Sequence, residues 1–199
     1  DRAIEINPEY AEAYTERGGV HKSLTQINAA QDDYDKAIRL NPQDAVAYYN
    51  RGTIYQTRHL AEEALADFNA SLELDSQNVA AYHSRGTVYQ GQGRYEEALA
   101  DFDKAVACNP DNAPTYISRG DVYRMLGRLD EALADYGQAI ERYPGNAAVY
   151  FRRGSVYREL GRYDEALADY MSAVDINPRS AVAYYGRGQV YEGLGQTED

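Results

Sequence analysis

A short pattern of residues returns six times along this chain at a fixed interval of 34 residues. The pattern contains a glycine and, four residues before it, a tyrosine. The glycines are Gly18, Gly52, Gly86, Gly120, Gly154 and Gly188, and the tyrosines are Tyr14, Tyr48, Tyr82, Tyr116, Tyr150 and Tyr184. A fixed period of this length is typical of stacked structural repeats, in which each unit contacts only its neighbours. Such a chain presents an extended surface rather than a single pocket, so the period restricts both fold and function.

Within each unit, hydrophobic spacing predicts two helices joined by a short turn. In unit 45–78, Tyr48 and Tyr55 share one helical face, and Ala64 and Phe68 share another further on. Asp or Asn precedes most of the first helices, where its side chain caps free N–H groups; these residues are Asp44, Asn78, Asn112 and Asn146, with Ser180 in the sixth unit. A glycine suited to leaving a helix occupies the turn at Gly93, Gly127 and Gly161. Thr25 and His59 replace it in the first two units, which we expect to be less regular and more mobile than the last three.

The period also sets the expected boundaries of the units. Residues 1–10 are the tail of a preceding repeat, and 181–199 contain the first helix of a truncated sixth. The five full repeats are 11–44, 45–78, 79–112, 113–146 and 147–180. Because the pattern is interrupted at both ends, we expect the chain to come from a longer continuous array.

The residues that recur within a unit resemble a known repeat family. Unit 79–112 carries Tyr82, Gly86, Tyr89, Ala98, Phe102, Ala105 and Pro110. This spacing resembles the tetratricopeptide repeat over essentially the whole chain. The resemblance implies an all-α fold, a right-handed superhelical solenoid of antiparallel helix pairs. Gly86 and Ala98 would let the two helices approach closely, while the aromatic residues fill the space beside them.

Each unit also departs from the family pattern in a regular way. An arginine precedes every repeated glycine, and an aspartate follows that arginine by 16 residues in the five full units. In an antiparallel helix pair these two positions lie near each other. We therefore predict an ion pair such as Arg85 with Asp101, repeated along the array as a packing feature rather than a ligand site.

Composition excludes several classes of function. The formal net charge is −12, from 32 acidic and 20 basic residues, which argues against general affinity for nucleic acid. No apolar run reaches the length of a membrane span, so membrane insertion is not expected. Cys108 is the single cysteine and excludes an intramolecular disulfide, which fits a reducing compartment and favours a cytoplasmic location.

Catalytic and metal-binding patterns are missing from the sequence. His21, His59 and His83 lie in different units without the spacing of metal ligands. Cys108 occupies an apolar position near a helix end, which predicts a buried, inert thiol. We therefore expect no enzyme activity, no cofactor and no metal.

The family resemblance implies that the first helices line a concave groove. The residues matching its ligand-facing positions include Thr15, Gly19 and Lys22, followed by Tyr49, Asn50, Thr53, His83, Thr87, Ile117, Asp121, Arg124, Phe151, Arg152, Ser155, Arg158 and Tyr185. We expect Arg124, Arg152 and Arg158 to gather around Phe151 and Tyr185. This group favours a peptide with an acidic residue against the arginines and an apolar one against Phe151, since arginine suits carboxylate recognition. A chaperone-type carboxylate clamp is not expected, because Ala148 stands where the lysine beside Arg152 would be.

These patterns predict a non-catalytic scaffold that binds a partner protein or peptide in the groove. Two alternatives stay open. The chain could be the repeat region of a larger enzyme resembling the repeat-bearing sugar transferases. It could also self-assemble into a homo-oligomer through its end helices, because 181–195 would expose an apolar face.

Overall fold

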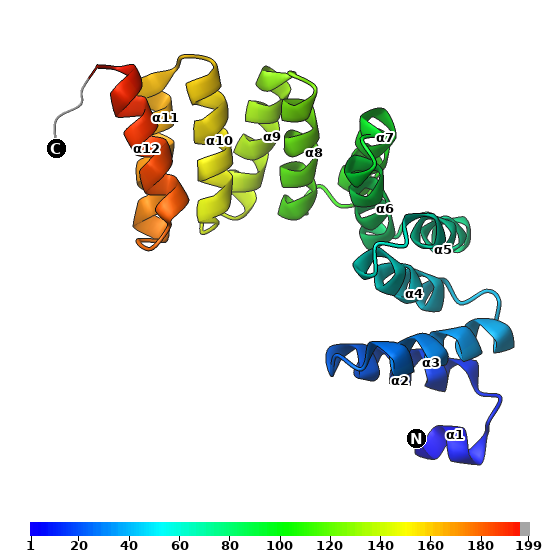
Figure 1. Ribbon diagram of the computed structural model, residues 1–199. Coiled ribbons are helices and arrows are strands. Elements are labelled where there is room, and N and C mark those ends of the chain that lie inside the picture. The colour runs from blue at the N-terminus through cyan, green and yellow to red at the C-terminus, as the bar shows by residue number, and fades with distance from the viewer. Residues whose placement is uncertain (196–199) are drawn as a thin grey trace. The chain divides into compact units, whose positions relative to one another are not determined.

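The computed structural model describes residues 1–195 and shows an all-α protein (Figure 1). The described residues form twelve helices and no strand. In chain order these are α1 (Arg2–Ile6), α2 (Ala11–Ser23), α3 (Ile27–Leu40), α4 (Ala45–Thr57), α5 (Ala61–Leu74), α6 (Val79–Gly91), α7 (Tyr95–Cys108), α8 (Ala113–Met125), α9 (Leu129–Arg142), α10 (Ala147–Glu159), α11 (Tyr163–Ile176) and α12 (Ala181–Gly193). They group into two compact units, Asp1–Cys108 and Asn109–Asp199, which are described separately below.

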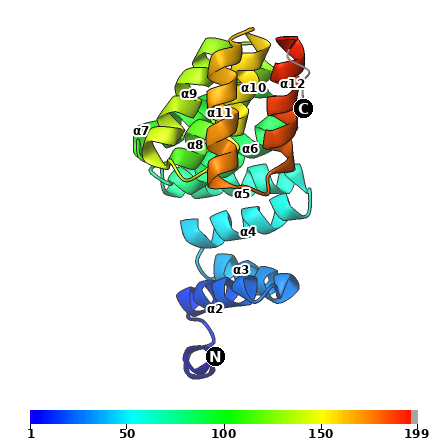
Figure 2. The same ribbon diagram turned by 90° about the vertical axis from the view of Figure 1, so that its left-hand side faces the viewer.

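The helices pack as consecutive pairs, which confirms the predicted architecture. In the first unit α2 packs on α3, α4 on α5, and α6 on α7. In the second unit α8 packs on α9, and α10 on α11. Neighbouring pairs also contact each other within a unit, and α11 lies beside α12 in both Figure 1 and Figure 2. In every pair the first helix has 13 residues and the second has 14, so the expectation of less regular first units is wrong for helix length.

The repeated glycine is where the two helices of a pair come closest. A Cβ atom at Gly86 would lie 2.8 Å from the ring of Phe102, which is fully buried. Atoms essentially never approach so closely, so only glycine fits there without movement of its neighbours. Gly18, Gly52 and Gly120 show the same contact at 2.7 to 2.8 Å, and at Gly154 the distance is 3.1 Å, which is still tight. A Cβ at Gly188 in α12 would meet nothing within 4 Å among the described residues. The predicted reason for the glycines is therefore confirmed in the full repeats and not at Gly188.

The turns between paired helices require a left-handed backbone. Gly93, Gly127 and Gly161 have φ angles of 71° to 73°. Thr25 and His59 hold the same conformation, with φ of 62° and 59°. A side chain disfavours this region, so these two turns carry backbone strain that the glycine turns avoid.

The arginine and aspartate of each full repeat form the predicted ion pair. Arg85 Nε donates to Asp101 Oδ2 at 2.7 Å, and Nη2 donates to Oδ1 at 2.6 Å. The Asp101 side chain is only 7% exposed, so the two-point contact is largely withdrawn from water. The same bidentate geometry joins Arg17 to Asp33, Arg51 to Asp67, Arg119 to Asp135, and Arg153 to Asp169.

The third guanidinium nitrogen links neighbouring repeats within the first unit. Arg51 Nη1 donates to Asp35 at 2.7 Å, and Arg85 Nη1 donates to Asn69 at 2.6 Å. Both acceptors lie on the second helix of the preceding repeat. At the corresponding place before Arg153 the chain has Gly137, which offers no side-chain acceptor. The ion pair therefore holds each repeat together, and its extra bond also joins some repeats to their neighbours.

Side-chain caps begin four of the first helices, α4, α6, α8 and α10. The Asp44 side chain accepts hydrogen bonds from the backbone N–H groups of Val46 and Ala47. Asn78, Asn112 and Asn146 cap their helices in the same way, as predicted. The prediction is wrong for Ser180, whose side chain makes no capping bond. Cys108 is a free thiol that is partly exposed rather than buried, because it lies in the last turn of α7.

Candidate functional site

The predicted groove residues lie on the first helices of the repeats and are divided between the two units. Those of the first unit lie on α2, α4 and α6, and those of the second on α8, α10 and α12. In the first unit they are Thr15, Gly19, Lys22, Tyr49, Asn50, Thr53, His83 and Thr87; in the second they are Ile117, Asp121, Arg124, Phe151, Arg152, Ser155, Arg158 and Tyr185. Each unit therefore carries its own group of predicted groove residues.

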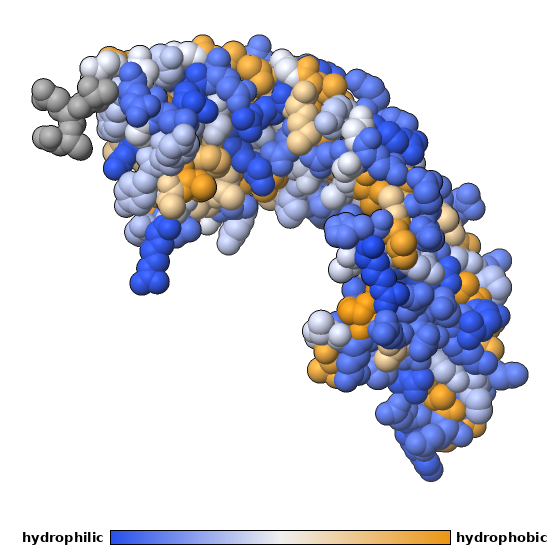
Figure 3. Space-filling model, in the orientation of Figure 1, coloured by the Kyte–Doolittle hydropathy of each residue, from blue (hydrophilic) through white to orange (hydrophobic). Residues whose placement is uncertain are grey.

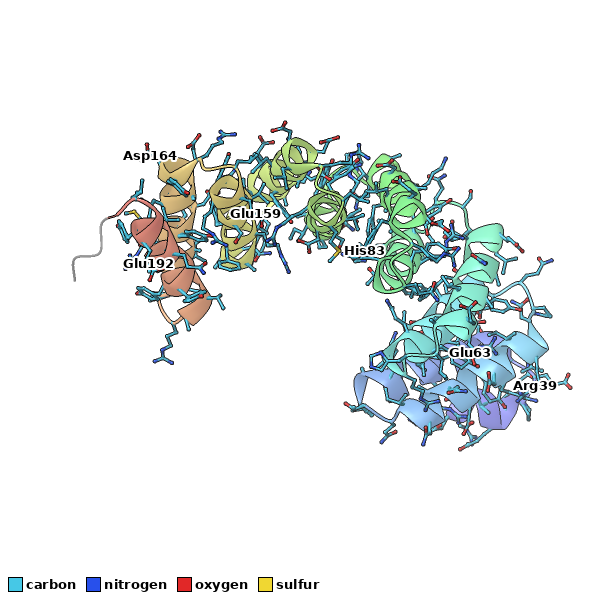
Figure 4. The ribbon with its side chains drawn as sticks, turned by 45° about the horizontal axis from the view of Figure 1, so that its top comes forward. Arg39, Glu63, His83, Glu159, Asp164 and Glu192 are labelled. Carbon is cyan, nitrogen blue, oxygen red and sulfur yellow. The ribbon has the colours of Figure 1, made fainter. Side chains whose placement is uncertain are left out.

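In the second unit, two of the predicted arginines already have carboxylate partners. Arg124 donates through Nε to Glu159 Oε1 at 3.0 Å, and its Nη2 contacts the same oxygen. Glu159 ends α10 and is labelled in Figure 4. Arg152 Nη1 lies 3.4 Å from Asp121 Oδ2. Glu159 also raises the pKa of Arg124, by accepting its hydrogen bonds. These four residues and Met125 line a shallow cleft of about 360 Å³.

Arg158 differs from the other two arginines. Within residues 1–195 it forms no ion pair, and its buried Nε atom, like that of Arg152, has no hydrogen-bond partner. The sequence explains the difference. Arg124 reaches Glu159, which is 35 residues further on, whereas the residue 35 positions after Arg158 is Gly193. Arg158 is therefore a partly buried cation without a carboxylate partner in the described part of the chain.

The predicted aromatic anchors do not gather around the arginines. Phe151 packs against the buried ring of Tyr170, with ring centroids 5.7 Å apart. Tyr185 is 68% exposed, and its hydroxyl accepts a hydrogen bond from Gln189. Neither residue lines the cleft between Asp121 and Glu159. The structure thus brings Arg124, Arg152 and Asp121 together and leaves the aromatic side chains as separate features of the same unit.

Two further predicted residues are held by buried tyrosines. Tyr136 donates its hydroxyl to Asp121 Oδ1 at 2.7 Å, and Tyr170 donates to Ser155 Oγ at 3.2 Å. Burial is the main cause that raises the pKa of Tyr136, with Asp121 adding to it. Asp121 therefore has two partners, Tyr136 and Arg152, and is not a free acidic group on the surface.

In the first unit, a lysine crosses between two first helices. Lys22 Nζ donates to Asn50 Oδ1 at 3.2 Å and to Thr53 Oγ1 at 2.6 Å. Burial lowers the pKa of Lys22, since water no longer fully solvates its charge. Lys22 also matches a ligand-facing position of the family. The sequence did not predict its two uncharged partners, Asn50 and Thr53, because they lie on the next repeat.

The remaining predicted residues of the first unit are packed against the core. Tyr49 lies over Phe68 with ring centroids 6.1 Å apart, and His83 lies over Phe102 at 5.6 Å. Thr87 donates its hydroxyl to the His83 backbone carbonyl. His83 is labelled on α6 in Figure 4. These contacts hold the side chains of Tyr49 and His83 against the core. Lys22 is the charged residue among the predicted groove residues of this unit.

Neither a metal-binding cluster nor a membrane-spanning helix occurs among residues 1–195. Among residues 1–195, no three His, Cys, Asp or Glu side chains are grouped so as to hold a metal ion. No helix in the same part of the chain is long and apolar enough to cross a bilayer. On the face drawn in Figure 3, hydrophobic residues form small patches separated by hydrophilic ones.

Three family models match the sequence. Two are described as tetratricopeptide repeat: one matches residues 43–108 and 77–145, and the other matches residues 123–168. The third is described as TPR repeat, over residues 20–57 and 154–195. A comparison with curated proteins found no significant match.

Solved structures with a similar fold include three that cover nearly all of this chain. YrrB, described as a TPR protein with an unusual peptide-binding site, is 28% identical, with 94% of this chain and 96% of YrrB covered and a TM-score of 0.78. A thermophilic TPR protein of Thermus thermophilus is 25% identical, with coverage of 92% and 99% and a TM-score of 0.67. The PilF protein of Pseudomonas aeruginosa is 18% identical, with coverage of 94% and 85% and a TM-score of 0.83, and shares the fold.

Proposed function

We propose that this chain, which belongs to the tetratricopeptide repeat family, is a non-catalytic scaffold that binds an acidic peptide segment of a partner protein. Peptide binding is supported by the likeness to YrrB, whose description names a peptide-binding site. The non-catalytic role is supported by the family and by the scattered histidines, which lie on α2, on the turn before α5 and on α6.

Arg158 carries the acidic part of this proposal. It lies on a first helix, its Nε atom is buried, and the chain supplies no carboxylate to it within the described range. A buried polar group without a partner is costly, so a carboxylate that accepts from this guanidinium would bind favourably. Arg124 and Arg152 contribute less to such binding, since an incoming acid would have to displace Glu159 or Asp121.

A peptide library displayed on phage would test the proposal. Selected peptides would then be measured by fluorescence polarisation against the wild type, Arg158→Ala and Arg162→Ala. Arg162 is a matched control because it is also on the second unit but pairs with Glu165 three residues away. We expect selected peptides to carry Asp or Glu, and Arg158→Ala to weaken binding about tenfold or more, while Arg162→Ala has no effect. Peptides without acids, or equal binding to both variants, would reject the role of Arg158.

Self-association is the second candidate function, and exposed apolar side chains on α12 favour it. Val182 is 57% exposed, and Tyr184 and Tyr191 are also exposed. Such side chains could contact a second copy of the chain. Sedimentation velocity over a range of concentrations would test this, and a monomer mass at every concentration would eliminate it.

A further inference from the structure

The second helices carry an aromatic residue at one repeated position, and in three repeats it is a tyrosine. These residues are Tyr34, Phe68, Phe102, Tyr136 and Tyr170. In α8 and α10, the residue directly after the repeated glycine accepts the tyrosine hydroxyl. Asp121 does so for Tyr136 at 2.7 Å, and Ser155 for Tyr170 at 3.2 Å. The corresponding residue on α2 is Gly19, which has no side chain to act as acceptor.

Tyr34 is consequently left without an acceptor. Its side chain is fully buried, and its hydroxyl has no hydrogen-bond partner among residues 1–195. A Cβ atom at Gly19 would lie 3.9 Å from this hydroxyl and would meet no other described atom within 4 Å outside its own stretch of helix. No side chain of α2 therefore fills, in the first unit, the place that the acceptor occupies in the second. An unpaired buried hydroxyl is unfavourable, so an oxygen placed over Gly19 would be stabilising.

A cation lies one helical turn further along the same face of α2. Lys22 Nζ donates to two neutral oxygens, Asn50 Oδ1 and Thr53 Oγ1. Within the described part of the chain, no carboxylate pairs with it. A partly buried ammonium group with only neutral partners gains from an anion at close range. An unpaired hydroxyl donor thus lies beneath Gly19, and a cation without a carboxylate partner in the described chain lies one turn away on α2.

In the second unit, a carboxylate lies between a tyrosine hydroxyl and a cation. There the Asp121 carboxylate accepts from Tyr136 and pairs with Arg152 at 3.4 Å. In the first unit Tyr34 matches Tyr136, and Asn50 stands at the position of Arg152. The Lys22 ammonium group lies 3.2 Å from Asn50 Oδ1, so a cation is present there, but the carboxylate is lacking. We infer that the surface over Gly19 binds a carboxylate of the partner, which accepts a hydrogen bond from the Tyr34 hydroxyl and pairs with Lys22.

The phenol stays protonated in this arrangement. Burial, assisted by Asp33 and Glu16, raises the pKa of Tyr34 to about 12. At neutral pH the hydroxyl is therefore a donor. The inference rests on the proposed role as a partner-binding scaffold, but it involves the first unit and is independent of Arg158.

Nuclear magnetic resonance of protein labelled at tyrosine Cζ would test the site. Tyr34→Phe identifies the Tyr34 signal, and this change is compatible with the fold because Phe68 and Phe102 occupy the same position in other repeats. Two carboxylate probes distinguish the possible sources: N-acetyl-alanyl-alanine offers a C-terminal carboxylate, and N-acetyl-glutamate α-amide offers a side-chain one. The corresponding glutamine amide is the neutral control.

We expect at least one carboxylate probe to shift the Tyr34 signal in a saturable way, and the neutral control to have no effect. Gly19→Asp places an internal carboxylate at the site, as Asp121 does, and Lys22→Gln removes the charge; each should weaken the response about tenfold or more. The other tyrosine signals report that both variants remain folded. No shift with either carboxylate, an equal shift with the neutral probe, or an undiminished response in Gly19→Asp would overturn the inference. Arg158→Ala should leave the Tyr34 response unchanged, which separates this test from that of the peptide proposal.

Discussion

Replacing Gly120 by alanine tests the close packing on which each repeat depends. The new Cβ atom would lie 2.8 Å from Cε1 of Tyr136, 3.1 Å from Cδ1 and 3.3 Å from Cζ. The ring of Tyr136 is fully buried, and its hydroxyl is held by Asp121 at 2.7 Å. The ring therefore has little freedom to move away, and the two helices must separate or the hydrogen bond must lengthen.

The expected loss of stability follows from these contacts. Overpacking a well-packed core costs about 1–3 kcal/mol, and weakening the bond between Tyr136 and Asp121 costs about 1 kcal/mol more. Alanine recovers about 0.5–1 kcal/mol because it favours the helix over glycine. The net destabilisation is about 2 kcal/mol, which for a chain of this size corresponds to a decrease in Tm of roughly 4–8 °C.

Gly137→Ala is the matched control in the same helix pair. Gly137 lies inside α9, and a Cβ there would meet nothing within 4 Å in the described structure. This variant should gain about 0.5–1 kcal/mol. Urea unfolding followed by circular dichroism measures both variants, and native-state hydrogen exchange shows where the change lies, because repeat arrays can unfold in parts. If Gly120→Ala were as stable as Gly137→Ala, the close-approach explanation of the glycines would be wrong.

Four other substitutions test the remaining features of the repeats. Arg153→Ala and Asp169→Ala should each destabilise the chain, and a double-mutant cycle should give a coupling of about 1–2 kcal/mol; additive losses would contradict the ion pair. His59→Gly should raise the free energy of unfolding by about 0.5–1 kcal/mol in thermal unfolding, since it relieves a left-handed backbone, and a decrease would refute the strain. Asp44→Ala should cost about 1–2 kcal/mol by urea titration, because Asp44 caps α4 and also accepts from Thr15 at 2.6 Å; no loss would show that the cap is dispensable.

Features that recur in every repeat could be predicted from the sequence. The glycine, the buried aromatic residue and the bidentate arginine–aspartate pair each occupy fixed positions, so one antiparallel helix pair explains them all. Arg85 and Asp101 could be paired from their separation because the turn lies midway between them. Thr25 and His59 could be recognised as turn residues because glycine stands there in later repeats.

Features that differ between repeats could not be predicted in the same way. The pairing of Arg124 with Glu159 depends on the direction of two long side chains on neighbouring repeats. Because Glu159 neutralises Arg124, this arginine is not one of three unpaired positive charges, as the sequence had suggested. The net charge of the chain gave no sign of this pairing. The unpaired hydroxyl of Tyr34 was also missed, although a signal existed. A glycine follows the repeated glycine only in the first repeat, and the aromatic residue there is a tyrosine rather than a phenylalanine.

The third nitrogen of the repeated arginine has a consequence for cooperativity. In a linear array, the number of repeats that unfold together depends on the free energy of each interface between neighbouring repeats. Arg51 adds a charged bond to the interface before it, through Asp35, whereas Arg153 meets Gly137 and adds none there. The charged contacts between repeats 113–146 and 147–180 instead join their first helices, from Arg124 to Glu159 and from Arg152 to Asp121. An acid that displaced Glu159 or Asp121 would therefore also weaken the coupling between these two repeats.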